Sequence, residues 1–403
     1  MVSALLLVGL LVAVFVGFNI GGSSTGVAFG PAVGAGTISK IGAAVLMTGF
    51  ALLGGVTVGT EVVKTLGGQI VPQSAFTLGT SIAVLFFIGF ALFLSNVVGV
   101  PASTSMTAVG AIAGLGLAQG NLNWAEIGEI VSWWLFAPVL AFWVCGVIGR
   151  YFYPRLVESF AISQSEGSLL VLDRSGSMPW PALGPGTTRR EFVGTLSVVG
   201  IGCYMAFSAG ASNVANAVAP LVGSGSLGLY DGVLLGGAAI GLGAFTIARR
   251  TMDTVGNDLT DLPILAALVV AVVSSTLVTV LSALGVPASF VIIATMSIVG
   301  LGWGRATRTA TIGDAVRGGG DQPAVSPGAL AAESDDAPTV GGQGGTPEAT
   351  GHKAIGEEEP EDLPKASDLF EPATTARVIL LQNIVPAIAT VASYLLFRFV
   401  PVF

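Results

Sequence analysis

Apolar runs long enough to cross a lipid bilayer recur along the whole chain, and they limit the fold more than any other feature. A helix of about 20 apolar residues spans the hydrocarbon core of a membrane. The 403 residues are 52% hydrophobic and only 10% charged, whereas soluble domains carry about 25% charged residues. We therefore predict an all-α polytopic membrane protein. Its predicted apolar segments are residues 3–20, 24–36, 41–59, 76–98, 103–118, 128–149, 191–209, 212–224, 228–248, 263–284, 288–303 and 377–400.

The second constraint is an internal repeat. The stretch "GGSSTGVAFGPAVGAG" begins at residue 21 and "GASNVANAVAPLVGSG" at residue 210, and they share 7 of 16 positions, which indicates two homologous halves. The pentapeptide "GVPAS" also occurs twice, at 99–103 and 285–289. Repeated halves in a membrane protein are typical of transporters. The predicted organisation is a first transmembrane repeat at 1–150, a cytoplasmic linker at 151–190, the first five segments of a second repeat at 191–303, an acidic disordered cytoplasmic loop at 304–376 and a last transmembrane helix at 377–403.

Basic residues give the predicted topology in the cell membrane. Arg249, Arg250 and Arg305 flank span ends, and the positive-inside rule places such ends in the cytoplasm. The N- and C-termini are then outside, and each half makes five crossings, so the halves form inverted-topology repeats. This count requires 191–209 and 212–224 to cross the membrane once together. We therefore predict a broken or re-entrant helix at "GASNVANA" and at its first-half counterpart.

The interrupted motifs predict an anion site near the middle of the membrane. Irregular backbone inside a bilayer is stable only where it lines a cavity, and a helix N-terminus offers free N–H groups and partial positive charge to an anion. "PASTS" (101–105) and "PAS" (287–289) predict two more helix starts. Four helix N-termini would then converge on one oxyanion, although single small residues in membrane helices more often serve packing. The candidate anion-binding residues are Ser23, Ser24, Ser103, Thr104, Ser105, Ser212, Asn213, Asn216 and Ser289.

Residue types that carry most enzymatic chemistry are scarce. The only histidine is His352, in a polar stretch, and both cysteines, Cys145 and Cys203, lie inside apolar runs. No Lys follows a Gly, so the phosphate-binding loop of an ATPase is missing. We therefore predict that the protein is not an enzyme and has no metal centre or cofactor, with sodium (Na+) considered only as a coupling ion.

In content and order, these motifs resemble those of the inorganic phosphate transporter (PiT) family, which also includes sulfate permeases. The "GANDVANA" signature of the family matches "GASNVANA" at 210–217 and, more weakly, "GGSSTGVA" at 21–28. The "PVSTTH" element matches "PASTSM" and "PASFVI", and the "VxETIG" element matches "VVKTLG" and "TMDTVG". The resemblance covers nearly the whole chain. It implies secondary transport of an inorganic oxyanion, coupled to sodium or protons, by a homodimer.

Departures from the family pattern bear on the substrate. The aspartates of the signature correspond to Ser24 and Asn213, and the glutamates of "VxETIG" to Lys64 and Asp253. Phosphate near neutral pH carries a proton that needs an acceptor, whereas sulfate carries none and is repelled by a carboxylate. Phosphate is the first choice because of its frequency in the family, and sulfate is the alternative favoured by this chemistry. Glu61 and Lys64, expected near the outer rim, and Asp253, near the cytoplasmic rim, are candidates for coupling or gating.

Two other classes of function stay open at this point. An anion channel would need a continuous wet path, and broken inverted repeats argue against one. A non-transporting scaffold or sensor would recruit partners through the loop at 304–376, which holds 13 of the 24 acidic residues. The expected partners of a transporter are instead phosphate or sulfate, the lipid bilayer and a second copy of the chain, with no nucleic acid.

Overall fold

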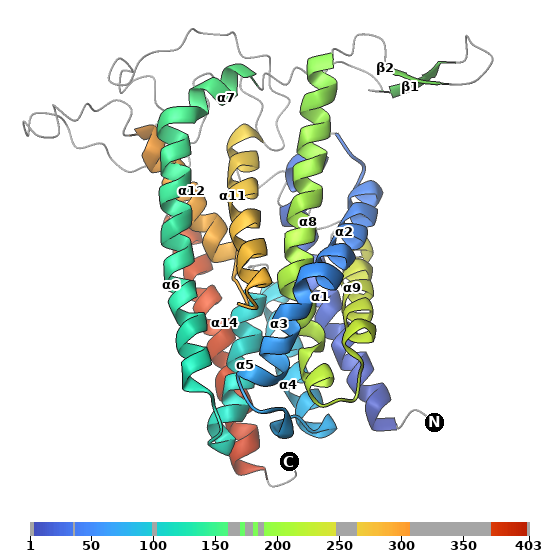
Figure 1. The fold of residues 1–403 in the computed structure, drawn as a ribbon, viewed down its shortest axis with the longest axis vertical. Helices are drawn as coiled ribbons and strands as arrows, with labels where there is room; N and C mark the ends of the chain where they lie inside the picture. Colours follow the sequence, from blue (N-terminus) through green and yellow to red (C-terminus); the bar gives the residue numbers. More distant parts are fainter. Residues whose placement is uncertain are drawn as a thin grey trace, which may run out of the picture.

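The molecule is a bundle of long helices that run side by side (Figure 1). The computed structural model describes residues 4–34, 37–98, 103–159, 170–173, 180–183, 189–246, 264–306 and 372–400. In Figure 1, α1 begins and α14 ends at the lower end of the bundle, while α7 and the β1–β2 hairpin lie at the upper end. The two ends of the described chain therefore lie on the same side of the bundle, as an even total of crossings requires.

Helices account for most of the described chain, and a single antiparallel hairpin pairs Leu170 with Leu183. The α-helices are α1 Ala4–Gly34, α2 Lys40–Gly54, α3 Thr60–Lys64, α4 Leu78–Val98, α5 Thr104–Gln119, α6 Trp124–Val147, α7 Tyr153–Ser159, α8 Arg189–Gly223, α9 Leu229–Thr246, α11 Ile264–Ala283, α12 Phe290–Ala306 and α14 Pro372–Phe399. The π-helical turns are η1 Gly55–Gly59, η2 Thr65–Gln69 and η4 Ile148–Phe152, the 3-10 turn is η3 Gln73–Ala75, and the strands are β1 Leu170–Asp173 and β2 Trp180–Leu183.

The predicted membrane class is confirmed, because seven helical stretches of the described chain are long and apolar enough to cross a bilayer. Helices α2, η1, α3 and η2 follow one another without a gap and form one of these stretches. Helix α12 and the end of α14 are shorter apolar helices. The seven stretches are Ala4–Gly22, Lys40–Gln69, Leu78–Val97, Trp124–Val157, Phe192–Gly223, Leu229–Thr246 and Leu265–Ala283.

The predicted interruption of the two signature motifs is wrong. Helix α1 runs without a break through 21–28, and α8 runs without a break through 210–217. The predicted pair of segments at 191–209 and 212–224 is a single helix of 35 residues, which is about 52 Å long. One long helix makes this crossing by itself, so no break is needed.

The glycines that suggested a break instead allow helices to cross closely. A Cβ atom at Gly210 would overlap the carbonyl oxygen of Ala51 in α2, and one at Gly54 would overlap that of Phe207 in α8. In α1, a Cβ at Gly21 would overlap the carbonyl oxygen of Ile240 in α9. Glycine in an exposed helix lowers stability by about 1 kcal/mol, but here tertiary packing keeps the helix intact and uses the space that glycine leaves.

Two helical hairpins take the place of the predicted interruptions. Hairpin one consists of α4 and α5, and hairpin two consists of α11 and α12. Helix α5 has 16 residues and α12 has 17, which makes them about 24 and 26 Å long, less than the roughly 30 Å of a hydrocarbon core. Helix α11 ends near the middle of the bundle in Figure 1. The start of α5 and the tip of hairpin two therefore lie inside the bundle, and Ser103, just before α5, is only 2% exposed.

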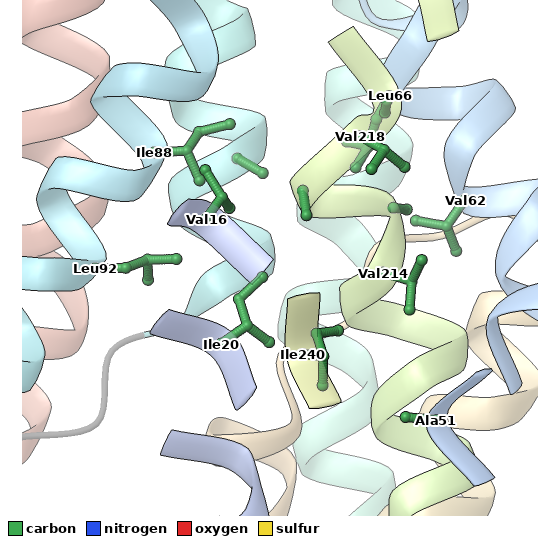
Figure 2. Close-up of a cluster of buried hydrophobic side chains, with 14 of the residues drawn as sticks. Val16, Ile20, Ala51, Val62, Leu66, Ile88, Leu92, Val214, Val218 and Ile240 are labelled. Atoms are coloured by element: carbon green, nitrogen blue, oxygen red, sulfur yellow. The ribbon is translucent and has the colours of Figure 1, made fainter. Parts of the chain in front are cut away.

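Each half of the chain packs mainly against the other half. Helix α1 packs on α9 and α8 on α2, while α5 packs on α14 and α6 on α12. Equivalent helices thus exchange partners between the halves, and α1 and α8 run in opposite directions in Figure 1. The main buried cluster contains side chains from both halves, such as Ile20 of α1 beside Ile240 of α9 (Figure 2). This pattern is what inverted-topology repeats would produce, and that relation stays a prediction.

Candidate functional site

The candidate site lies where the tips of the two hairpins meet α8. From hairpin one, Thr104 Oγ1 donates to Asn213 Oδ1 at 2.6 Å, and Ser105 Oγ lies 3.3 Å from Ser212 Oγ. Ser212 Oγ also donates to the carbonyl oxygen of Ala288, in the tip of hairpin two, at 3.0 Å. The starts of α5 and α12 therefore lie on either side of one serine of α8.

Both helix starts follow from the local sequence. Ser103 is the N-cap of α5: its backbone is extended (φ −73°, ψ 105°) and its Oγ accepts a hydrogen bond from the Met106 N–H at 3.3 Å. Ser289 comes directly before α12, and its carbonyl accepts from the Ile293 N–H at 3.3 Å. The first N–H groups of each helix have no acceptor within the helix and carry its partial positive charge. Two positive helix ends are thus buried near each other.

The hydroxyl protons of this cluster can be assigned from the acceptors. Ser212 has one hydroxyl proton, and the Ala288 carbonyl can only accept, so Ser105 must donate to Ser212. Asn216 Nδ2 then donates to Ser105 Oγ and to Asn213 Oδ1, each at 3.3 Å. Thr104, Ser105 and Ser212 therefore direct their protons to protein acceptors.

Three donor groups at the tips keep protons available for a ligand. Ser289 is only 6% exposed and its Oγ has no hydrogen-bond partner, although leaving a buried polar group unpaired costs about 1–3 kcal/mol. The Ser103 hydroxyl, 2% exposed, only accepts, and the Asn213 amide uses only its oxygen. One buried acceptor, Asn216 Oδ1, is also without a partner. An oxyanion is the ligand that such donors and helix ends would bind.

The predicted site residues are therefore brought together in part. Ser103, Thr104, Ser105, Ser212, Asn213, Asn216 and Ser289 all lie at the hairpin tips or on the facing part of α8. The side chains of Ser23 and Ser24 are outside the part of the chain that the structure describes. The predicted convergence of four helix N-termini is wrong, because α1 and α8 are continuous at their motifs. Two N-termini, those of α5 and α12, remain.

The charged pair of candidates lies beside the tip of hairpin two, because a Cβ at Gly285 would be 3.6 Å from the Glu61 carbonyl oxygen. Glu61 and Lys64 form an ion pair at 2.7 Å with both side chains about half exposed. A Cβ at Gly59 would lie 3.0 Å from the Ala211 carbonyl oxygen, and one at Gly67 would lie 3.0 Å from that of Ala219. The ion pair is thus level with the signature motif of α8, deeper than the predicted outer rim. Asp253 lies outside the described residues.

The segments that form the hairpin tips and the facing part of α8 contain no carboxylate. No Asp or Glu occurs within 103–107, 208–217 or 284–293. Among the described residues, no group of three His, Cys, Asp or Glu side chains is close enough to hold a metal ion. These three segments therefore carry no charged side chain, and the positive potential that they supply comes from helix ends and polar hydrogens.

Other contacts that position the tips were not predicted. Trp134 Nε1 in α6 donates to the Pro287 carbonyl at 2.7 Å, and Asn96 Nδ2 in α4 donates to Asn19 Oδ1 in α1 at 3.0 Å. Both bonds join elements that are far apart in sequence. The only sequence signal for these bonds was a polar side chain within an apolar run, and that signal does not identify the residue to which the side chain bonds.

A family model described as the phosphate transporter family matches residues 20–319. The chain belongs to the phosphate transporter family. One relative is named sulfate permease CysP, from Bacillus subtilis, and is 32% identical to the chain over 297 residues, or 73% of the chain and 77% of the relative. A protein provisionally named a phosphate permease, from Pyrococcus furiosus, is 24% identical over 362 residues, or 75% of the chain and 88% of the relative.

The fold of this family member matches a solved structure from end to end. A structure titled as the sodium-dependent phosphate transporter superposes with a TM-score of 0.66 and covers 98% of both chains at 18% identity. At this level of identity, the comparison shows the fold of the chain but not which ligands it binds. Family membership and the membrane fold identify the chain as a non-enzymatic transporter of the phosphate or sulfate permease type.

Proposed function

We propose that the chain carries sulfate across the cell membrane by a secondary transport mechanism. The observation that carries this proposal is the donor-only chemistry of the free hydroxyls at the tips, Ser103 and Ser289, in segments that contain no Asp or Glu. Sulfate has no proton to donate, so donors satisfy it and a carboxylate would repel it. The 32% identity to a relative named sulfate permease supports the same choice. Sulfate is thus placed ahead of phosphate, which reverses the sequence-based preference for phosphate.

Phosphate is the second candidate, and one specific observation favours it. Asn216 is fully buried and its Oδ1 has no partner, so it is the acceptor that a protonated phosphate oxygen would need. Uptake of radiolabelled sulfate and phosphate into proteoliposomes separates the two. Sulfate uptake that excess unlabelled phosphate does not reduce supports the proposal, and the reverse pattern contradicts it.

Cation coupling and alternating access are part of the proposal. The opposite directions of α1 and α8, and the exchange of helix partners between the halves, support alternating access. Hydrogen bonds join both hairpins to α8 through Ser212, which supports a gated transporter rather than an open channel. Sodium or protons would supply the driving force. Uptake measured with a sodium gradient alone and with a pH gradient alone identifies the coupling ion.

Removal of the Ser289 hydroxyl is expected to weaken transport without weakening the fold. Because Ser289 Oγ has no protein partner, Ser289→Ala loses no internal hydrogen bond and should leave the melting temperature unchanged or higher. A hydrogen bond to an ion is worth about 1.5–3 kcal/mol, so KM for sulfate should rise about tenfold or more.

The control for this variant is Thr295→Val on the same helix, since Thr295 Oγ1 donates to the Val291 carbonyl of its own helix at 2.8 Å. It should leave KM unchanged. An unchanged KM in Ser289→Ala would remove Ser289 from the anion site.

The proposed orientation can be checked by cysteine labelling. Ser74 is exposed in η3, in the connection that leads into α4, and Arg155 is exposed in α7, which lies at the upper end of the bundle. In a background without Cys145 and Cys203, Ser74→Cys should react with an impermeant maleimide in intact cells. Arg155→Cys should react only after the membrane is opened, because the positive-inside rule places this end in the cytoplasm. Labelling of Arg155→Cys in intact cells would show that the proposed orientation is reversed.

A further inference from the structure

We propose that Ser212 is a positioning residue that latches the two hairpins together, and that it is not an anion ligand. This inference rests on the proposed transport function, because it describes how the two gates of one transporter move together. It departs from the sequence-based prediction, which placed Ser212 among the anion-binding residues.

The latch is a continuous chain of hydrogen bonds through the centre of the bundle. Asn216 Nδ2 donates to Ser105 Oγ at 3.3 Å, Ser105 donates to Ser212 Oγ at 3.3 Å, and Ser212 donates to the Ala288 carbonyl at 3.0 Å. Every member is buried: Ser105 and Ser212 are 1% exposed, Ala288 is 2% exposed and Asn216 is 0% exposed. The chain begins on α8, enters hairpin one, returns to α8 and ends on hairpin two.

The number of hydroxyl protons explains why Ser212 cannot donate a hydrogen bond to an anion while the latch is formed. Its single hydroxyl proton points to the Ala288 carbonyl, and its oxygen accepts the proton of Ser105. An oxyanion would need that same proton. Binding through Ser212 would therefore break its bond to hairpin two, whereas binding through Ser289 breaks no bond, because Ser289 Oγ is unpaired.

Other bonds hold each hairpin separately. Thr104 ties hairpin one to Asn213 of α8, Trp134 of α6 holds the tip of hairpin two through Pro287, and Ser208 of α8 donates to the Ser275 carbonyl of hairpin two at 3.1 Å. Among the side-chain hydrogen bonds of the described residues, those of Ser212 alone reach both hairpins. Outward movement of either tip from α8 therefore changes the bonding of the other tip, which links the two gates.

Hydrogen–deuterium exchange of the substrate-free protein tests the latch without relying on transport. The variant is Ser212→Ala, and the control is Ser208→Ala, which lies one helical turn away on α8 and bonds to hairpin two only. Ser212→Ala should speed exchange at least tenfold in peptides covering both 103–108 and 284–293. Ser208→Ala should affect hairpin two only. Faster exchange at one tip alone, or at neither, in Ser212→Ala overturns the latch.

Transport assays then separate a latch from a ligand. In Ser212→Ala, the sulfate Kd in detergent should stay within twofold of the unaltered protein, while sulfate efflux from proteoliposomes without any cation gradient should rise at least tenfold. A tenfold weaker sulfate Kd would show that Ser212 is an anion ligand and would reject the latch. Sulfate efflux that stays at the level of the unaltered protein would also reject the latch. If the unaltered protein moves neither sulfate nor phosphate, the transport proposal fails, and the exchange experiment still decides the role of Ser212.

Discussion

Asn213→Asp is expected to reverse the anion preference of the transporter. Asn213 Oδ1 accepts from Thr104 and from Asn216, and an aspartate of the same shape keeps both bonds. It replaces the free amide donor with a carboxylate oxygen, which repels sulfate and accepts the proton of phosphate. Sites that match hydrogen-bonding groups discriminate strongly between otherwise similar ligands. We expect the ratio of sulfate to phosphate uptake to fall about 100-fold, measured with both labelled anions at equal concentrations.

The control for charge is Gln119→Glu, which adds the same negative charge at the exposed far end of α5. Its side-chain oxygen can still accept from Asn121 Nδ2, and the anion ratio should stay within twofold. An unchanged ratio in Asn213→Asp would place selectivity elsewhere in the protein. Equal loss of both anions would show that Asn213 binds them without distinguishing them.

Gly210→Ala is expected to destabilise the fold by about 3 kcal/mol or more, because one added methyl group has no space. The new Cβ would overlap the backbone carbonyl of Ala51, and backbone cannot rotate away as a side chain can. Overpacking of a well-packed interior typically costs about 1–3 kcal/mol, and here α2 and α8 would have to separate along their crossing. Thermal unfolding in detergent and the yield of monodisperse protein measure the effect.

Gly200→Ala is the matched control on the same helix. A Cβ at Gly200 would meet no atom within 4 Å, and alanine favours helix over glycine by up to about 1 kcal/mol. This variant should be as stable as the unaltered protein or more so. Equal stability of the two variants would mean that α2 and α8 do not cross as closely as the structure places them.

The class of the fold and the starts of α5 and α12 could be predicted from the sequence, because both depend on residues that are close together in the chain. Composition and run length identify a membrane protein, and the Pro-Ala-Ser elements predicted helices that begin near Ser103 and Ser289, as observed for α5 and α12. The error at "GASNVANA" has a physical origin. Gly, Ser and Asn suit both a helix break and a close polar helix crossing, and only the neighbouring α2 decides between them.

Most of the candidate site depends on partners that are distant in sequence. The bond between Ser212 and Ala288 spans 76 positions and that between Ser105 and Ser212 spans 107, so no local pattern indicates them. The interrupted-motif argument made Ser212 an anion-binding candidate, whereas in the structure its hydroxyl donates to the Ala288 carbonyl. Assembly as a homodimer and the identity of the coupling ion stay predictions of the family resemblance.

The exchange of helix partners between the halves has a consequence for how the protein is made. When the ribosome has completed α6, the surfaces of α1, α5 and α6 that face α9, α14 and α12 have nothing to pack against. The last of these partners to be synthesised is α14, which begins at Pro372. The nascent first half therefore stays in the membrane with unpacked helix surfaces until the second half is inserted. Truncation before Pro372 leaves α5 without its main neighbour, however well the earlier helices insert.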